Sequence, residues 1–123
     1  MIYNEKYRVR FYQDSRTAKS DVYRYITSLN IKVRSKIIKY IEYLRDNNGY
    51  LGEPYSRHID SSLRELRVDF SNNRYRVFYY LLTKKRIVIL HAFLKKTQKT
   101  PRREIVKAKK NLIDCINNIY LYE

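Results

Sequence analysis

Three consecutive stretches in the second half of the chain carry strand-like patterns, and these patterns limit the fold more than any other feature. In residues 65–70 and 74–81, apolar side chains occupy every second position, the period of a strand with one buried face. Residues 87–94 are almost continuously apolar, which is typical of a strand buried on both faces. Asn72-Asn73 and Lys84-Lys85 separate the stretches as turn candidates. The pattern predicts three consecutive antiparallel strands.

The flanking sequence predicts one more strand and three helices. Residues 7–12 (YRVRFY) alternate as a first strand, and a helix is expected to begin after Asp14 and Ser15, which are good N-cap types. A second helical stripe ends near residues 47–49. A last helix is expected from Thr100-Pro101, with Thr100 as the cap and an apolar stripe of Ile105, Ala108, Leu112, Ile116 and Ile119.

The predicted order is therefore β-α-α-β-β-β-α, an α+β fold with a mainly antiparallel sheet packed against a helical pair and a C-terminal helix. No repeat, low-complexity segment or long linker interrupts the 123 residues. We therefore expect one domain spanning residues 1–123.

The turns place the charged residues on one side of the sheet. An Asn72-Asn73 turn would set Ser71 opposite Arg74, Asp69 opposite Arg76 and Arg67 opposite Phe78. A Lys84-Lys85 turn would set Phe78 opposite His91, Arg76 opposite Phe93 and Arg74 opposite Lys95. One face then carries Arg67, Arg76, His91, Lys95, Glu65 and Asp69; the other carries Leu66, Val68, Phe70, Val77, Tyr79 and Leu90. A one-residue slip at the second turn would move His91 to the opposite face.

The charge balance indicates a polyanionic partner. Lys and Arg number 27 against 12 Asp and Glu, which gives a net charge of +15 and a pI near 10. Several cations follow the last strand and lead into a helix N-terminus, where backbone N–H groups favour anions. Two plainer interpretations remain open: Arg67 and Arg76 as a solvated face paired with Glu65 and Asp69, and His91 as a hydrogen-bonded core residue.

Other partners are less well supported by composition. No apolar run approaches the roughly 20 residues of a membrane-spanning helix, and no apolar signal segment is expected at the N-terminus. Cys115 is the single cysteine, and His58 and His91 are far apart, so we expect no disulfide, no metal site and no cofactor. A lone cysteine favours a reducing cytoplasm.

Three segments together resemble the HigB-like branch of the RelE superfamily of toxin–antitoxin toxins. They are residues 63–67 (LRELR), 75–79 (YRVFY) and 87–101 (IVILHAFLKKTQKTP). The resemblance implies an mRNA endonuclease that acts on translated mRNA in the ribosomal A site. It also implies neutralisation by a co-encoded antitoxin, often a helix-turn-helix protein.

The resemblance also suggests roles for individual residues. It implies that Arg67 lines the RNA cleft and that Arg76 contacts the scissile phosphate. With His91 and Lys95 these are the expected catalytic residues, and the expected RNA-binding residues are Arg64, Arg74, Lys96, Lys99 and Arg102. Some RelE-type members place a catalytic tyrosine in the last helix, whereas residues 101–107 contain none.

Metal-independent cleavage proceeds by attack of the RNA 2′-hydroxyl on the adjacent phosphate. Arginines suit the phosphate, since a guanidinium can bind two of its oxygens. His91 titrates nearest neutrality and is the first choice for proton transfer, with Glu65 as an alternative base. On this reasoning Arg76→Ala should abolish cleavage and leave the fold intact.

Two other functions fit parts of the pattern. A ParE-like toxin would share the fold but poison DNA gyrase without cleaving RNA. A non-catalytic RNA- or ribosome-binding module would need only the positive charge and the tyrosines.

Overall fold

A five-stranded sheet forms the centre of the structure, a computed structural model that describes residues 6–60, 62–83 and 85–123. The elements are β1 (Arg8–Phe11), α1 (Asp21–Ser28), α2 (Ile31–Asp46), β2 (Ser56–Asp60), β3 (Leu63–Phe70), β4 (Asn73–Leu82), β5 (Arg86–Lys95), α3 (Arg102–Asn117) and a 3₁₀ turn, η1 (Ile119–Tyr122). The strand order is β1-β5-β4-β3-β2, and only the pairing of β1 with β5 is parallel within these residues. The predicted α+β class is confirmed, with β2 as an additional edge strand.

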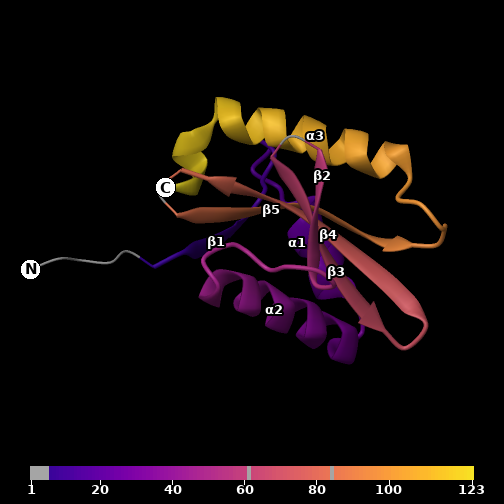
Figure 1. Cartoon of the computed structure of the whole chain (residues 1–123). Coiled ribbons are helices and arrows are strands. Elements are labelled where there is room, and N and C mark those ends of the chain that lie inside the picture. The colour runs from indigo at the N-terminus through magenta and orange to yellow at the C-terminus, as the bar shows by residue number, and fades with distance from the viewer. Residues whose placement is uncertain (1–5, 61, 84) are drawn as a thin grey trace, which may run out of the picture.

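Helices cover both faces of the sheet (Figure 1). The α1–α2 pair packs on one face over a core that includes Ile26, Ile37, Leu44, Leu66 and Val77. The third helix, α3, packs on the other face over a second core that includes Phe78, Leu90, Phe93, Ala108 and Cys115. Both faces of β5 are therefore buried, as its continuous apolar sequence predicted.

The β3–β4 turn is displaced from its predicted position. Phe70 pairs with Asn73, so Ser71 and Asn72 form the turn, and Ser71 has φ 56°. A positive φ at only the first central residue is the type II′ pattern rather than type I′. Arg67 consequently lies opposite Arg76, and not opposite Phe78 as predicted. The displacement is two residues in register, so every side chain keeps its predicted face.

The β4–β5 pairing contains two irregularities that compensate for each other. Leu82 pairs with Arg86, so three residues connect the strands in place of the predicted two. A bulge between Phe78 and Tyr79 then adds one residue to β5 and restores the predicted pairing of Phe78 with His91. Leu90 is the extra residue, and it joins the core beneath α3. The prediction that Leu90 shares a face with Leu66 and Val77 is therefore wrong.

Two helix starts also differ from the predictions. Helix α1 begins at Asp21, where the Ser20 side chain accepts the Tyr23 N–H; Asp14 instead closes a local turn by accepting the N–H groups of Arg16 and Thr17. Helix α3 begins at Arg102 with Pro101 as its N-cap residue, and the Thr100 hydroxyl donates to Glu65 instead of capping.

The other predicted limits and stripes are partly confirmed. Helix α2 ends near Asn47, as predicted, and Gly49 follows at φ 81°. Residues with a Cβ rarely adopt such a positive φ, so this backbone conformation favours glycine at position 49. On α3, Cys115 is buried, whereas Ile116 from the predicted stripe is 42% exposed. Among the described residues, none of the helices is both long and apolar enough to cross a membrane.

The turn geometry leads to a stability prediction. Ser71 occupies the turn position that glycine adopts without steric cost, so Ser71→Gly should raise the free energy of unfolding by about 0.5–1 kcal/mol. Urea unfolding measures the change. The control is Ser35→Gly inside α2, where glycine should lower stability by a similar amount. Equal destabilisation by both substitutions would contradict the proposed turn strain.

Candidate nucleic-acid interface

Three rows of side chains cross β3, β4 and β5 on the face that carries α3. The rows are Glu65–Phe78–His91, Arg67–Arg76–Phe93 and Asp69–Arg74–Lys95. The predicted face is thus assembled, although the partners within the β3–β4 rows differ. The first turn of α3 and the residue before Pro101 reach this face through Glu104 and Thr100. We call the charged residues of these rows, together with Arg57 of β2, the polar face.

Glu65 is the centre of the polar face. Its side chain is 1% exposed, and its Oε1 lies 3.8 Å from Arg76 Nε, 3.9 Å from Arg57 Nε and 4.0 Å from Arg67 Nε. Its Oε2 accepts a hydrogen bond of 3.1 Å from the Thr100 hydroxyl. A carboxylate buried this deeply needs such partners, because unpaired it would be strongly destabilising. The cations are therefore held at fixed positions around one buried anion.

Arg76 is buried, and its side chain is not accessible at the surface of the polar face. Its side chain is 2% exposed, and Nη1 donates to Asp69 Oδ1 at 2.8 Å and to its neighbour's carbonyl, Tyr75 O, at 2.9 Å. Its Nε makes no hydrogen bond and lies only within ion-pair distance of Glu65. In this conformation Arg76 supports the polar face from below, while Arg67, whose side chain is 29% exposed, lies nearer the surface.

Lys95 belongs to the same electrostatic group. Its pKa is lowered, first because partial burial disfavours the charged ammonium and then because Arg76 lies nearby; Glu65 opposes this shift, and Arg67 and Arg57 add to it. A lysine with a lowered pKa releases and takes up a proton more readily near neutrality. Lys95 therefore combines a position among the arginines with a lowered pKa.

His91 lies beneath the first turn of α3. Its Nε2 lies 3.0 Å from Glu104 Oε1, and its ring stacks on Phe93 and Phe78 with centroid distances of 5.7 and 6.4 Å. Burial lowers the pKa of His91, and the hydrogen bond to Glu104 partly offsets this. With its side chain 12% exposed, His91 corresponds best to the hydrogen-bonded core residue considered above.

The remaining predicted RNA-binding residues divide into two groups. Arg74, Lys96, Lys99 and Arg102 are exposed at the sheet end, in the loop after β5 and at the start of α3. Arg64 lies on the opposite face, where it donates to Tyr79 Oη and Ser56 Oγ, each at 3.2 Å, and sits over the Tyr50 ring. The alternation of β3 itself separates Arg64 from Arg67.

Arg57 and Glu104 were not identified from the sequence. Arg57 comes from β2, a five-residue edge strand whose alternation is too short to stand out. Glu104 lies in the first turn of α3, where acidic residues are common for reasons of helix dipole alone. A prediction of how α3 crosses the sheet would have been needed to connect it with His91.

A basic pocket of about 370 Å³ adjoins the polar face at the β3–β4 turn. Its lining is Asn72, Asn73, Arg74, Leu94, Lys95, Lys96, Thr97 and Gln98. Amide, hydroxyl and cationic groups converge there, and no carboxylate lines it. This composition suits a phosphate or sugar oxygen.

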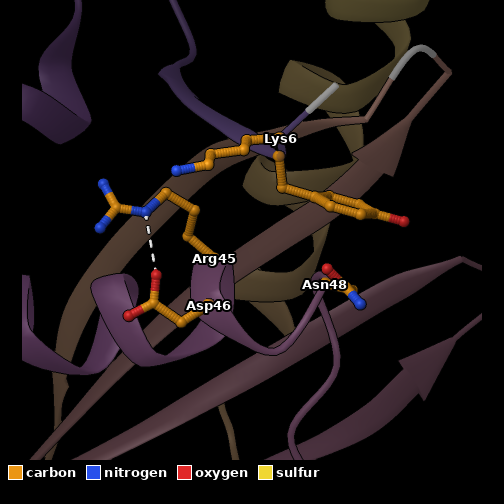
Figure 2. Close-up of a pocket in the computed structure, with 5 residues that line it drawn as sticks. Lys6, Arg45, Asp46 and Asn48 are labelled. Atoms are coloured by element: carbon orange, nitrogen blue, oxygen red, sulfur yellow. Dashed lines mark hydrogen bonds and ion pairs between the residues drawn. The ribbon is translucent and has the colours of Figure 1, made fainter. Parts of the chain in front are cut away.

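A cavity of about 550 Å³ lies elsewhere, where the start of β1 approaches the C-terminal end of α2 (Figure 2). Lys6, Tyr7, Arg45, Asp46 and Asn48 line it, and Asp46 pairs with Arg45 at 3.4 Å. Its lining shares no residue with the polar face, so it is not part of the candidate site. The described ranges contain no group of three or more His, Cys, Asp or Glu side chains placed to hold a metal ion.

The burial of Arg76 predicts a large effect on stability. Arg76→Ala should lower the free energy of unfolding by about 3–5 kcal/mol, because it leaves Glu65 buried without its closest cation. Chemical denaturation measures the loss, and Arg74→Ala, an exposed arginine on the same strand, is the control and should stay within about 0.5 kcal/mol. The structure therefore does not favour the earlier expectation that Arg76→Ala leaves the fold intact. Equal stability of Arg76→Ala and Arg74→Ala would contradict the stabilising role of Arg76.

His91 predicts a pH dependence. Its pKa is lower in the folded chain than in the unfolded chain, so the unfolded chain binds more protons as the pH falls through about 6.5. Stability should therefore decrease as the pH falls below about 6.5, and His91→Gln should remove this component. Unfolding experiments at pH 7.5 and 5.5 test it, with His58→Gln as the control. If the loss of stability at low pH persists in His91→Gln and disappears in His58→Gln, the pH dependence belongs to His58, and the prediction for His91 is wrong.

A comparison with known protein families covers most of the fold. The model of the family described as "Phage derived protein Gp49-like (DUF891)" matches residues 24–112, which include α2, the strands β2–β5 and most of α3. The polar face lies entirely within the matched region. No curated protein matches the chain.

Proposed function

The chain belongs to the phage-derived Gp49-like family, a RelE/toxin-like family, and on that premise we propose that it is the HigB-like toxin of a type II toxin–antitoxin pair, an endonuclease that cleaves mRNA on the ribosome. Its partners in this proposal are translated mRNA and a cognate antitoxin of the helix-turn-helix type. The observation that carries the proposal is the cluster of Arg57, Arg67, Arg76 and Lys95 around one buried carboxylate.

The cluster suits cleavage by the RNA's own 2′-hydroxyl. In that reaction the 2′-oxygen bonds to phosphorus and the bond to the 5′-oxygen breaks, which leaves a 2′,3′-cyclic phosphate. One proton leaves the 2′-hydroxyl and one reaches the 5′-oxygen, and the phosphate gains negative charge on the way. Fixed cations that do not reorganise during the reaction stabilise this charge most effectively.

The proposal assigns different tasks to the two more accessible cations. Arg67 binds the phosphate oxygens, because it is partly exposed and its guanidinium is already oriented by Glu65. Lys95 transfers a proton, because its lowered pKa suits it to that task more than the arginines. Arg76 is a positioning residue that acts through Glu65 and Asp69. Mutual orientation of mRNA and these groups is supplied by the ribosome.

Cleavage of a translated message tests the proposal. Arg67→Ala should reduce the cleavage rate by about 10²- to 10³-fold, the usual effect of removing one transition-state stabiliser. Lys95→Arg keeps the charge and removes the transferable proton, so it should retain RNA affinity while losing rate. The measurement is primer extension on an mRNA undergoing translation, with Arg24→Ala on the exposed side of α1 as the control.

Each outcome has a distinct meaning. Full cleavage by a folded Arg67→Ala variant would contradict the proposal. Absence of cuts together with gyrase-dependent DNA breaks would indicate the ParE-like alternative. RNA binding without cuts by the unsubstituted chain would indicate a binding module.

A further inference from the structure

The polar face continues around an open edge of the sheet. Strand β2 pairs with β3 only from Leu63 to Leu66. Beyond that point Arg67 donates its backbone N–H to the Tyr55 carbonyl at 2.8 Å, and the chain before β2 turns away. Arg67 therefore stands at the corner where the polar face meets the side of the sheet covered by α2.

A groove begins at this corner and runs along α2. Lys36, Tyr40, Pro54, Tyr55, Arg67 and Asp69 line a cavity of about 230 Å³. A second cavity of about 560 Å³ shares Lys36, Tyr40 and Tyr55 and adds Ser35, Lys39 and Tyr43. The segment between α2 and β2 runs back along α2 (Figure 1). At the end of this segment Tyr55 contacts Tyr40 of that helix. We call the two cavities the tyrosine groove.

Aromatic rings form the walls of the groove. Tyr40 meets Tyr55 edge-on with ring centroids 5.9 Å apart, and Tyr43 at the same distance with an interplanar angle of 37°. Tyr43 and Tyr55 are 41% and 47% exposed. Rings that are held by one another and still open to solvent offer ready surfaces for stacking.

Cations accompany the rings. Lys36 Nζ lies 5.7 Å from the Tyr40 ring centroid, and Lys39 Nζ lies 5.8 Å from that of Tyr43. Lys36 also donates to the Asp69 carbonyl, so it is fixed beside the β3 edge. Aromatic faces in a positively charged groove are the arrangement by which proteins bind single-stranded nucleic acid.

We infer that the tyrosine groove binds unpaired bases of the RNA whose phosphate lies at Arg67. The inference rests on the proposed function, and it extends the site from one phosphate to the neighbouring nucleotides. Lys36 and Lys39 contact the backbone, and Tyr43 and Tyr55 stack on bases without selecting a sequence, since every base offers an aromatic face. The net charge of +15 favours RNA over a protein partner of mixed charge.

A binding experiment without ribosomes tests the groove. Fluorescence anisotropy of a labelled eight-nucleotide single-stranded RNA gives the dissociation constant. Tyr43→Ala and Tyr55→Ala should each weaken binding about 5- to 150-fold. Tyr43→Phe and Tyr55→Phe keep the ring and should bind like the parent chain. Tyr120→Ala is the matched control, because Tyr120 is 67% exposed in η1, beyond α3, and is absent from the groove lining.

Salt dependence separates stacking from charge. Arg67→Ala should reduce the slope of log affinity against log salt by about 0.7, whereas Tyr43→Ala should leave the slope unchanged. Thermal unfolding of each variant shows that the fold is retained.

The outcomes distinguish this inference from the proposed function. If Tyr43→Ala and Tyr55→Ala bind RNA as tightly as the parent chain and only Arg67→Ala loses affinity, the inference about the groove is wrong, but the proposed function is not contradicted. Equal loss in Tyr120→Ala, or no RNA binding by the parent chain, would also overturn it. Loss of binding in the groove variants supports the inference even if primer extension detects no cleavage. Unchanged RNA affinity with lost antitoxin binding would identify the groove as a protein-binding surface instead.

Discussion

The buried pair of Glu65 and Arg76 is the interaction on which the polar face depends. Both side chains are almost inaccessible, and a carboxylate at that depth is tolerated only when cations and donors surround it. The partners come from β2, β3, β4 and the residue before Pro101, so one anion ties four segments together. The loop after β5 is thereby anchored beside the strands whose side chains it flanks.

This arrangement explains how so much positive charge can lie on one surface. Four cations, Arg57, Arg67, Arg76 and Lys95, surround two carboxylates, Glu65 and Asp69. Glu65 offsets part of their mutual repulsion from below, and the excess remains directed outward. In the proposed function a bound phosphate offsets the rest, and the cations that would receive it are already held around Glu65.

Much of the fold could be predicted because side chains alternate along a strand, so the face of each residue depends only on whether its position is odd or even. The β3–β4 turn was misplaced, and the β4–β5 connection has a different length, yet Arg67, Arg76, His91 and Lys95 keep their predicted face. A register shift of two residues between β3 and β4 changes the cross-strand partners but leaves each side chain on the same face of the sheet. Between β4 and β5, the bulge compensates for the extra residue in the connecting loop. Leu90 shows the limit, since a bulge cannot be recognised in a continuously apolar strand.

How deeply each side chain is buried could not be predicted from the sequence. Alternation assigns Arg67 and Arg76 to the same face equally, although one is partly exposed and the other enclosed. Enclosure depends on where α3 crosses the sheet and on β2, a strand too short to be recognised. The position of α3 also places Glu104 Oε1 3.0 Å from His91 Nε2, and this leaves the His91 side chain only 12% exposed.

The shortness of β2 also connects the two halves of the proposed RNA path. An unpaired strand edge normally invites aggregation and is protected by charge or by cover. Here Arg67 and Asp69 put charge on the edge of β3, and Lys36 and Tyr55 flank it, so the protection has the composition of a nucleic-acid site. Two more paired residues in β2 would extend the sheet past Arg67 and separate the polar face from the tyrosine groove. The part of the β3 edge that lies beyond Arg67 has no β2 partner, and in the proposed RNA path this is where one strand passes from one surface to the other.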